Sequence, residues 1–119
     1  MKVQVLGAHN TESQDTKLMS LVIDDILALD AGGLTSSLSF SAQLKLKAIL
    51  ITHQHYDHIR DIPAIAMNFF LRRKVINIYS TPPVKEAVLT HLLSGDIYPR
   101  FQENFTPVFV SASNGLSLL

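Results

Sequence analysis

Four side chains that can bind a metal lie within six residues of this chain: His53, His55, Asp57 and His58, in the stretch ITHQHYDHIRDIP. Positions 53, 55 and 57 are two apart, so in an extended segment their side chains can project to one side, and His58 can swing beside them. Neutral imidazoles and a carboxylate suit a borderline metal such as zinc when no thiolate is present, and the chain has no cysteine. The cluster predicts a metal site, and a His pair followed by an Asp–His pair suits two neighbouring metals better than one.

The elements on either side of the cluster are those that would position it. An unbroken apolar run, residues 46–53, ends at the cluster and indicates a strand buried on both faces. In an α/β sheet, such a strand delivers its C-terminal loop to the crevice where ligands bind. Apolar side chains recur at helical spacing after the cluster. Because proline is tolerated in a first helical turn, Pro63 predicts a helix that begins close to Asp61 and ends at residues 72–74.

The rest of the chain alternates short strands with helices, in the order β-β-β-α-β-α-β-α-β that is typical of an α/β fold. We expect a hairpin turn at Asp24 and Asp25. The remaining expected elements are strands at about 2–7, 17–24, 26–33, 75–80 and 106–113, a helix at 34–45, and a helix that starts at Thr81 and Pro82 and reaches Ser94.

The composition is that of one small globular domain. Hydrophobic residues make up 47% of the chain, and ten basic residues balance ten acidic ones. No global charge therefore draws the chain to nucleic acid or to a membrane surface. No apolar run is long enough to span a bilayer, and the N-terminus lacks the apolar core of a signal peptide. We expect a cytoplasmic protein without a membrane partner.

Two stretches carry a family resemblance. The run His53-Gln54-His55-Tyr56-Asp57-His58 resembles the H-x-H-x-D-H motif of the metallo-β-lactamase fold hydrolases and matches every defined position. The upstream stretch ILALDAGG resembles the family's strand that ends in Asp-x-Gly, which implies that Asp30 lies beneath the metals. The segments after the motif resemble, more weakly, the phosphodiesterase and transfer-RNA 3′-processing branch.

The resemblance also implies roles for the motif residues. His53 and His55 would bind one metal, and Asp57 and His58 a second. Asp57 would be the catalytic residue, placed to handle a proton of the attacking water. The cofactor implied is a pair of divalent ions, zinc first, with manganese and iron as alternatives.

The resemblance covers only the N-terminal half of the family domain, an αββα sandwich of two sheets packed face to face. We therefore expect an α/β half, a mixed sheet with helices on one face, and residues 1–119 forming a single incomplete domain. The family site uses two further histidines and a bridging aspartate downstream of the motif. After His58 this chain offers one histidine, His91, and the aspartates Asp61 and Asp96.

Two functions stay open on this basis. The first is a metal-dependent hydrolase of phosphodiester-type substrates, whether small molecules, nucleotides or RNA, in truncated or half-domain form. The second is a metal-binding or assembly half-domain without independent turnover. Since an uncovered sheet face would leave apolar side chains in water, we expect a homodimer or another pairing through that face.

For four other features, a structural role is favoured over a functional one. His9 could line the rim of the site, but a loop role is favoured. His91 could replace a missing ligand, but it falls in a predicted helix. The basic residues 72–74 could touch a phosphate, but favourable charge at a helix C-terminus explains them. Asp61 is favoured as a helix cap rather than a ligand.

Overall fold

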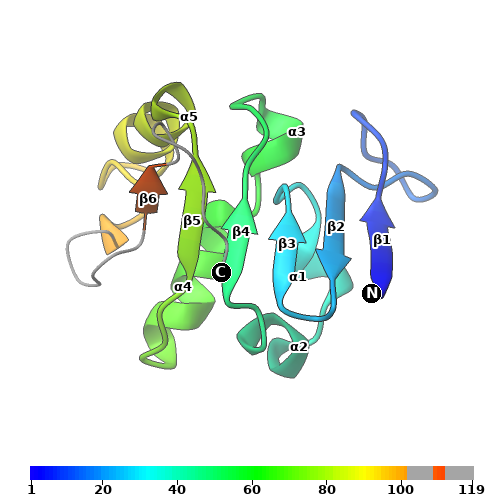
Figure 1. The fold of residues 1–119 in the computed structure, drawn as a ribbon. Helices are drawn as coiled ribbons and strands as arrows, with labels where there is room; N and C mark the ends of the chain where they lie inside the picture. Colours follow the sequence, from blue (N-terminus) through cyan, green and yellow to red (C-terminus); the bar gives the residue numbers. More distant parts are fainter. Residues whose placement is uncertain (102–108, 112–119) are drawn as a thin grey trace.

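The structure is a computed structural model, and it describes residues 1–101 and 109–111. These residues form a six-stranded sheet whose spatial order follows the chain (Figure 1). The strands are β1 (Val3–Gly7), β2 (Ser20–Ile23), β3 (Leu27–Leu29), β4 (Ala48–Leu50), β5 (Asn77–Ser80) and β6 (Phe109–Ser111). The helices are α1 (Leu34–Ser37), α2 (Phe40–Leu44), α3 (Tyr56–Ile59), α4 (Ile62–Leu71), α5 (Pro82–Ala87) and the π-helix η1 (Val88–Leu92).

The sheet is mixed, and its strand directions bring several loops to one edge. β1, β2 and β3 pair in antiparallel fashion, whereas β3, β4, β5 and β6 are parallel. The predicted hairpin turn is confirmed: Asp24 and Asp25 have φ values of 51° and 63°, as a type I′ turn requires. These pairings make β1, β3, β4 and β5 point the same way. The loops that follow them therefore lie at one edge of the sheet (Figure 1).

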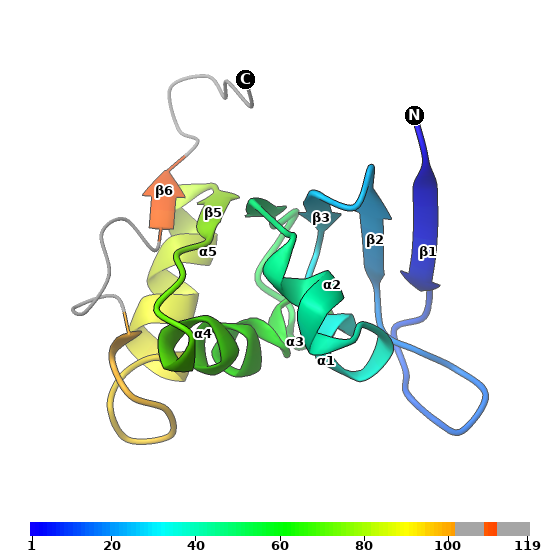
Figure 2. The ribbon, with the colours of Figure 1, turned by 90° about the horizontal axis from the view of Figure 1, so that it is seen from below.

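All the helices lie on one face of the sheet (Figure 2), which confirms the expected mixed sheet with helices on one face. α4 has Pro63 in its first turn and buries side chains spaced by three and four residues, as the sequence predicted. None of the helices in the described part of the chain combines the length and apolar character that crossing a bilayer requires. The core between the layers is built from Val22, Ala28, Ile49 and Ile78 of the sheet and from Leu34, Ile62, Ile65 and Phe69 of the helices.

The opposite face of the sheet is apolar, and no described element covers it. The strand register aligns one row of side chains across this face, and none of them is charged. The row consists of Val5, Leu21, Leu29, Leu50 and Tyr79. Val5 is 62% exposed, and the other four are half-buried. We call this surface the open face.

Several expected elements differ from those observed. The strands expected at 17–24 and 26–33 span only Ser20–Ile23 and Leu27–Leu29, the helix expected to reach Ser94 ends in the π-helix Val88–Leu92, and the short helix α3 was not expected. The helix expected at 34–45 is two helices, because Ser39 interrupts it and its side chain accepts a hydrogen bond from the Ala42 amide at 3.2 Å, which caps α2. The strand expected at 46–53 spans only 48–50. It ends early because the Thr52 amide donates to the Asp30 carboxylate, at 2.8 Å, instead of to a neighbouring strand. Of the last expected strand, residues 106–108 and 112–113 lie outside the described residues.

The two faces of β4 give a test of this one-sided burial. Ile49 is fully buried beneath the helices, and its neighbour Leu50 lies on the open face. We expect Ile49→Ala to lower the free energy of unfolding by about 2–5 kcal/mol and Leu50→Ala to lower it by much less, measured by urea denaturation. Equal costs for the two substitutions would show that the open face is covered in solution.

Candidate metal centre

The motif begins where β4 ends, at the edge where the parallel strands terminate. Ligand atoms of His53, Asp57 and His58 lie within 4.8 Å of one another, and among the described residues this is the only group of three or more that could hold a metal ion. The rings of His53 and His58 are 3.8 Å apart between centroids. The structure therefore brings three of the four predicted ligands together.

His55 is the predicted ligand that stands apart from this group. It occupies the N-cap position of α3, and its side chain is exposed. Its ring packs edge-on against His53 with 4.7 Å between centroids. His55 therefore borders the cluster on the solvent side, next to His53.

Asp30 lies directly beneath the cluster. Its side chain is buried, and its backbone is in the left-handed region at φ 62°. The carboxylate accepts hydrogen bonds from the Thr52 amide at 2.8 Å and the Thr52 hydroxyl at 2.9 Å, and it contacts Nδ1 of His58 at 2.8 Å. An ionised carboxylate can only accept hydrogen bonds. These contacts therefore fix the position of Asp30 and make the two Thr52 groups and Nδ1 of His58 the donors.

The same contacts set which nitrogen of each histidine faces outward. With Asp30 as acceptor, Nδ1 of His58 carries the proton and Nε2 keeps its lone pair. The Thr52 hydroxyl donates its one hydrogen to Asp30. Its oxygen, 3.2 Å from Nδ1 of His53, therefore accepts a hydrogen bond from that ring nitrogen. Nε2 of His53 is then free as well. Two neutral imidazoles oriented through their far nitrogens are the usual arrangement of metal-binding histidines.

Asp57 completes the donor set. Its Oδ2 lies 3.2 Å from Nε2 of His58, and both side chains are mostly buried. A carboxylate and two imidazole nitrogens that face each other at this spacing fit a divalent cation such as zinc, manganese or iron(II). The residues present thus fit the metal that the motif implies.

Gly32 permits the close approach of three chain segments at this edge. A Cβ atom at this position would overlap the carbonyl oxygen of Asp57 and would come within 2.7 Å of the Leu18 side chain and 2.8 Å of the Met19 carbonyl oxygen. The Gly32 amide donates to that Met19 oxygen at 2.9 Å. Only glycine therefore allows the turn after β3 to lie against the backbone of the motif.

Arg60 ties the loop after β1 to the motif. Its Nη1 lies 2.6 Å from the Glu12 carboxylate, and its Nε donates to Asp61 at 3.2 Å. Burial alone would lower the pKa of Arg60, but the hydrogen bonds and charges of Glu12 and Asp61 outweigh it and raise the pKa above its ordinary value. Arg60 is therefore always charged, and residues 8–17 are held beside the metal edge.

Asp61 and Arg72 make hydrogen bonds at helix ends. Asp61 stands at the N-cap position of α4, as expected, but makes no cap bond there. Its buried carboxylate instead accepts from the amide and the hydroxyl of Thr35, each at 2.9 Å, and so caps α1. Arg72 donates to the Asn68 carbonyl at the end of α4, which is the expected C-terminal interaction. α4 carries these basic residues to the sheet edge opposite the motif (Figure 1).

His9 and His91 lie outside the ligand group. His9 is in the loop at the metal edge, where its Nδ1 is 3.2 Å from the Lys17 carbonyl oxygen. His91 is exposed on η1. Sequence reasoning missed Thr52, Gly32 and Arg60 as positioning residues. Thr52 stands between the strand and the motif, which was a usable signal. Glu12, the partner of Arg60 in the loop after β1, is too distant in sequence for any local pattern to indicate.

A His–Asp–His cluster that follows a buried strand, over a buried aspartate in a mixed sheet with helices on one face, defines the N-terminal part of a metallo-β-lactamase fold. The family model described as the beta-lactamase superfamily domain matches residues 32–112, and the chain belongs to this family. Comparison with curated protein sequences gives no match.

Two of the solved structures that share this fold illustrate the extent of the match. The metallo-beta-lactamase fold protein YhfI from Bacillus subtilis is 20% identical with a TM-score of 0.62, and the match covers 93% of this chain and 44% of YhfI. A long form RNase Z from yeast is 17% identical with a TM-score of 0.66, and the match covers 92% of this chain and 18% of that one. This chain thus spans less than half the length of either protein.

The Thr52 hydroxyl gives a test of how the histidines are oriented. Thr52→Val keeps the shape of the side chain but removes the group that bonds both Asp30 and His53. We expect zinc affinity to fall about 10- to 100-fold, measured by competition with a chromophoric chelator. Thr52→Ser, which keeps the hydroxyl, serves as the control and retains the affinity. Equal affinity in the Val and Ser variants would contradict the assignment.

Two adjacent glycines give a test of the packing beneath Asp57. Gly32→Ala must push the Asp57 backbone aside, so we expect a loss of at least about 2 kcal/mol in stability together with weaker metal binding. A Cβ at Gly33 would lie 3.4 Å from its nearest neighbour, the Leu18 carbonyl oxygen, so Gly33→Ala is the matched control. Chemical denaturation and metal titration of both variants measure the difference, and wild-type behaviour of Gly32→Ala would refute the close contact.

Proposed function

We propose that this chain carries part of the active site of a divalent-metal hydrolase that acts on phosphodiesters. The observation that carries the proposal is the convergence of His53, Asp57 and His58 at a sheet edge, with Asp30 orienting the group from below. Membership in the beta-lactamase superfamily domain family supports hydrolytic chemistry. The fold shared with an RNase Z favours phosphodiester substrates, including nucleotides or RNA.

Each motif residue has a task in this proposal. His53 and His58 would hold metal through Nε2, and Asp57 would hold it through Oδ2. When bound, the metal supplies Lewis acidity and lowers the pKa of bound water. Asp57 is the catalytic residue, because its carboxylate faces the site and can accept a proton from the attacking water. Asp30 takes no part in the reaction and keeps the imidazoles in one tautomer.

We assign zinc as the first candidate metal, with manganese and iron as alternatives that the same ligands accept. Two ions are proposed, one near His53 and His55 and one near Asp57 and His58. The nitrogen atoms of His55 lie outside the three-residue group, and His55 reaches a metal by rotation of its exposed side chain. A complete zinc site has at least three protein ligands, so residues from elsewhere would complete each half-site.

A second function, metal binding or assembly without independent turnover, is favoured by one specific observation. The described residues contain a single three-ligand group. A two-metal mechanism requires ions held about 3.5–4 Å apart, and loosely held groups reduce the rate strongly. A chain with these ligands alone binds metal more readily than it turns over substrate.

The open face supports a proposal about partners. Val3 and Val5 are 49% and 62% exposed, and the row of side chains on this face includes no charge. We propose that a second copy of this chain, or the second sheet of the family fold, packs on this face. The contrast between Ile49 and Leu50 described above bears on this proposal, because a covered face makes Leu50→Ala costly.

Metal content and hydrolysis of bis(p-nitrophenyl) phosphate, measured on the same zinc- or manganese-loaded sample, test the proposed function. We expect bound metal that is lost on the double change His53→Ala and His58→Ala, with slow phosphodiester turnover that Asp57→Ala removes. The monoester p-nitrophenyl phosphate is the substrate control and should react more slowly. Bound metal with no turnover would favour the second function, and turnover that survives Asp57→Ala would contradict the first.

A further inference from the structure

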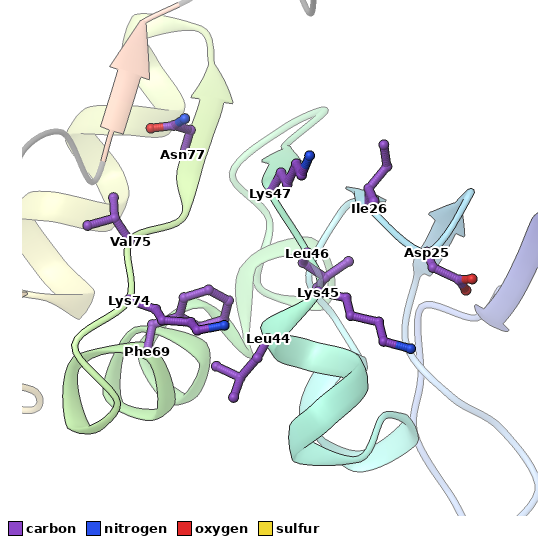
Figure 3. A pocket seen from close by; sticks show the side chains of 10 residues that line it. All are labelled: Asp25, Ile26, Leu44, Lys45, Leu46, Lys47, Phe69, Lys74, Val75 and Asn77. Atoms are coloured by element: carbon purple, nitrogen blue, oxygen red, sulfur yellow. The ribbon is translucent and has the colours of Figure 1, made fainter.

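A second site candidate lies at the sheet edge opposite the metal centre. A hollow of about 670 Å³ opens between the ends of α2 and α4 and the segments that enter β3, β4 and β5 (Figure 3). Its floor is apolar and includes Leu44, Leu46 and Phe69. A volume between about 300 and 1,000 Å³ with an apolar lining and a few polar groups is typical of small-molecule sites.

Three lysines stand around this hollow: Lys45, Lys47 and Lys74. In Figure 3 the Lys74 side chain runs in front of Phe69 with its ammonium directed toward the middle of the hollow, and Lys47 stands at the rim beside the start of β4. Lysine stems of this kind add apolar contact while the ammonium stays in reach of water or an anion.

The charges around the hollow are not balanced by the protein. Among the described residues, none of these three lysines has a carboxylate within ion-pair distance. The one acidic group in the lining, Asp25, is engaged by Lys2, with Nζ–Oδ distances of 3.1 and 3.4 Å. The chain as a whole has a net charge of zero, so this excess of positive charge is a local feature and raises the local concentration of anions.

The hollow continues toward the open face. A smaller cavity of about 220 Å³ shares Ile26, Lys47 and Asn77 with it and adds the apolar side chains of Leu27 and Ala48. An elongated apolar body can therefore extend from the lysines along the starts of the strands. An inorganic anion would leave this apolar surface wet, and a neutral apolar molecule would leave the ammonium groups unpaired.

We infer that this hollow binds a small amphipathic anion, an apolar body that carries one carboxylate or phosphate group. The Lys74 ammonium, with Lys47 at the rim, would pair with the head group, and Leu44, Leu46 and Phe69 would contact the apolar body. The inference does not depend on the metal centre, because the hollow is lined by the segments that enter β3, β4 and β5, whereas the motif follows the end of β4. The helices α2 and α3, next to the hollow and within the motif, lie at opposite edges of the sheet (Figure 1).

Methyl-resolved NMR titration of the intact chain tests the inference, with octanoate as the probe below its micelle concentration. We expect saturable shifts at Ile26, Leu46 and Val75, whose side chains are among those that line the hollow (Figure 3). Octanol and inorganic phosphate, each of which supplies only one half of the chemistry, should bind more weakly than octanoate. Shifts confined to Leu21 and Leu29 on the open face would overturn the site.

Paired lysine variants supply the matched control. Replacing Lys47 and Lys74 together by Gln should weaken octanoate binding by about three- to tenfold. Replacing Lys17 and Lys85 by Gln removes the same charge at positions outside the hollow and should leave binding unchanged. These lysines are partly or fully exposed, so the variants should remain folded, which amide spectra verify. Equal affinity in the two double variants would overturn the role of the lysines.

Discussion

The Asp30 carboxylate is the interaction on which the metal edge depends. A buried charge is costly unless donors satisfy it, and Asp30 takes them from the backbone of Thr52, from its hydroxyl and from the ring of His58. A left-handed backbone at a residue other than glycine costs about 1–2 kcal/mol, and these contacts hold Asp30 in it. The turn after β3 and the loop after β4 are joined through this one side chain, which explains why β4 ends at Leu50 and why both imidazoles present the same nitrogen.

The rest of the edge is built to keep that junction rigid. Gly32 lets the turn after β3 press against the Asp57 backbone, and Arg60 connects the loop after β1 to the buried carboxylate of Asp61. Asp61 in turn caps α1. The contrast with the other parts of the molecule is clear, since the open face has no cover in the described residues and the lysine-rimmed hollow is open to solvent. The contacts that fix the metal edge therefore come from several separate chain segments, as a rigid site requires.

Local pattern was sufficient for the order of the strands and for the place of the His–Asp–His cluster after β4. The apolar run before His53, the spacing of apolar residues after Pro63 and the two aspartates of the hairpin are all short-range signals, and each gave the right element. The break at Ser39 was missed because apolar spacing continues across it, whereas a single cap bond decides the outcome. The separate helix α3 was missed because four residues are too few for periodicity to detect. Asp30 was placed by family resemblance, and the Glu12–Arg60 pair links residues too far apart for any pattern to connect.

The sequence-local character of the ligand group has a consequence for how metal and folding are linked. His53, Asp57 and His58 are so close in the chain that the unfolded polypeptide also offers them to a metal ion. Stabilisation by a ligand depends on the ratio of its affinities for the folded and unfolded states, so binding to the unfolded chain reduces it. What the folded state adds is the orientation that Asp30 and Thr52 impose from outside the motif. The metal therefore stabilises the folded state only through the extra affinity that the paired strands β3 and β4 provide. Removing the metal with a chelator should loosen the loop after β4 without unfolding the sheet.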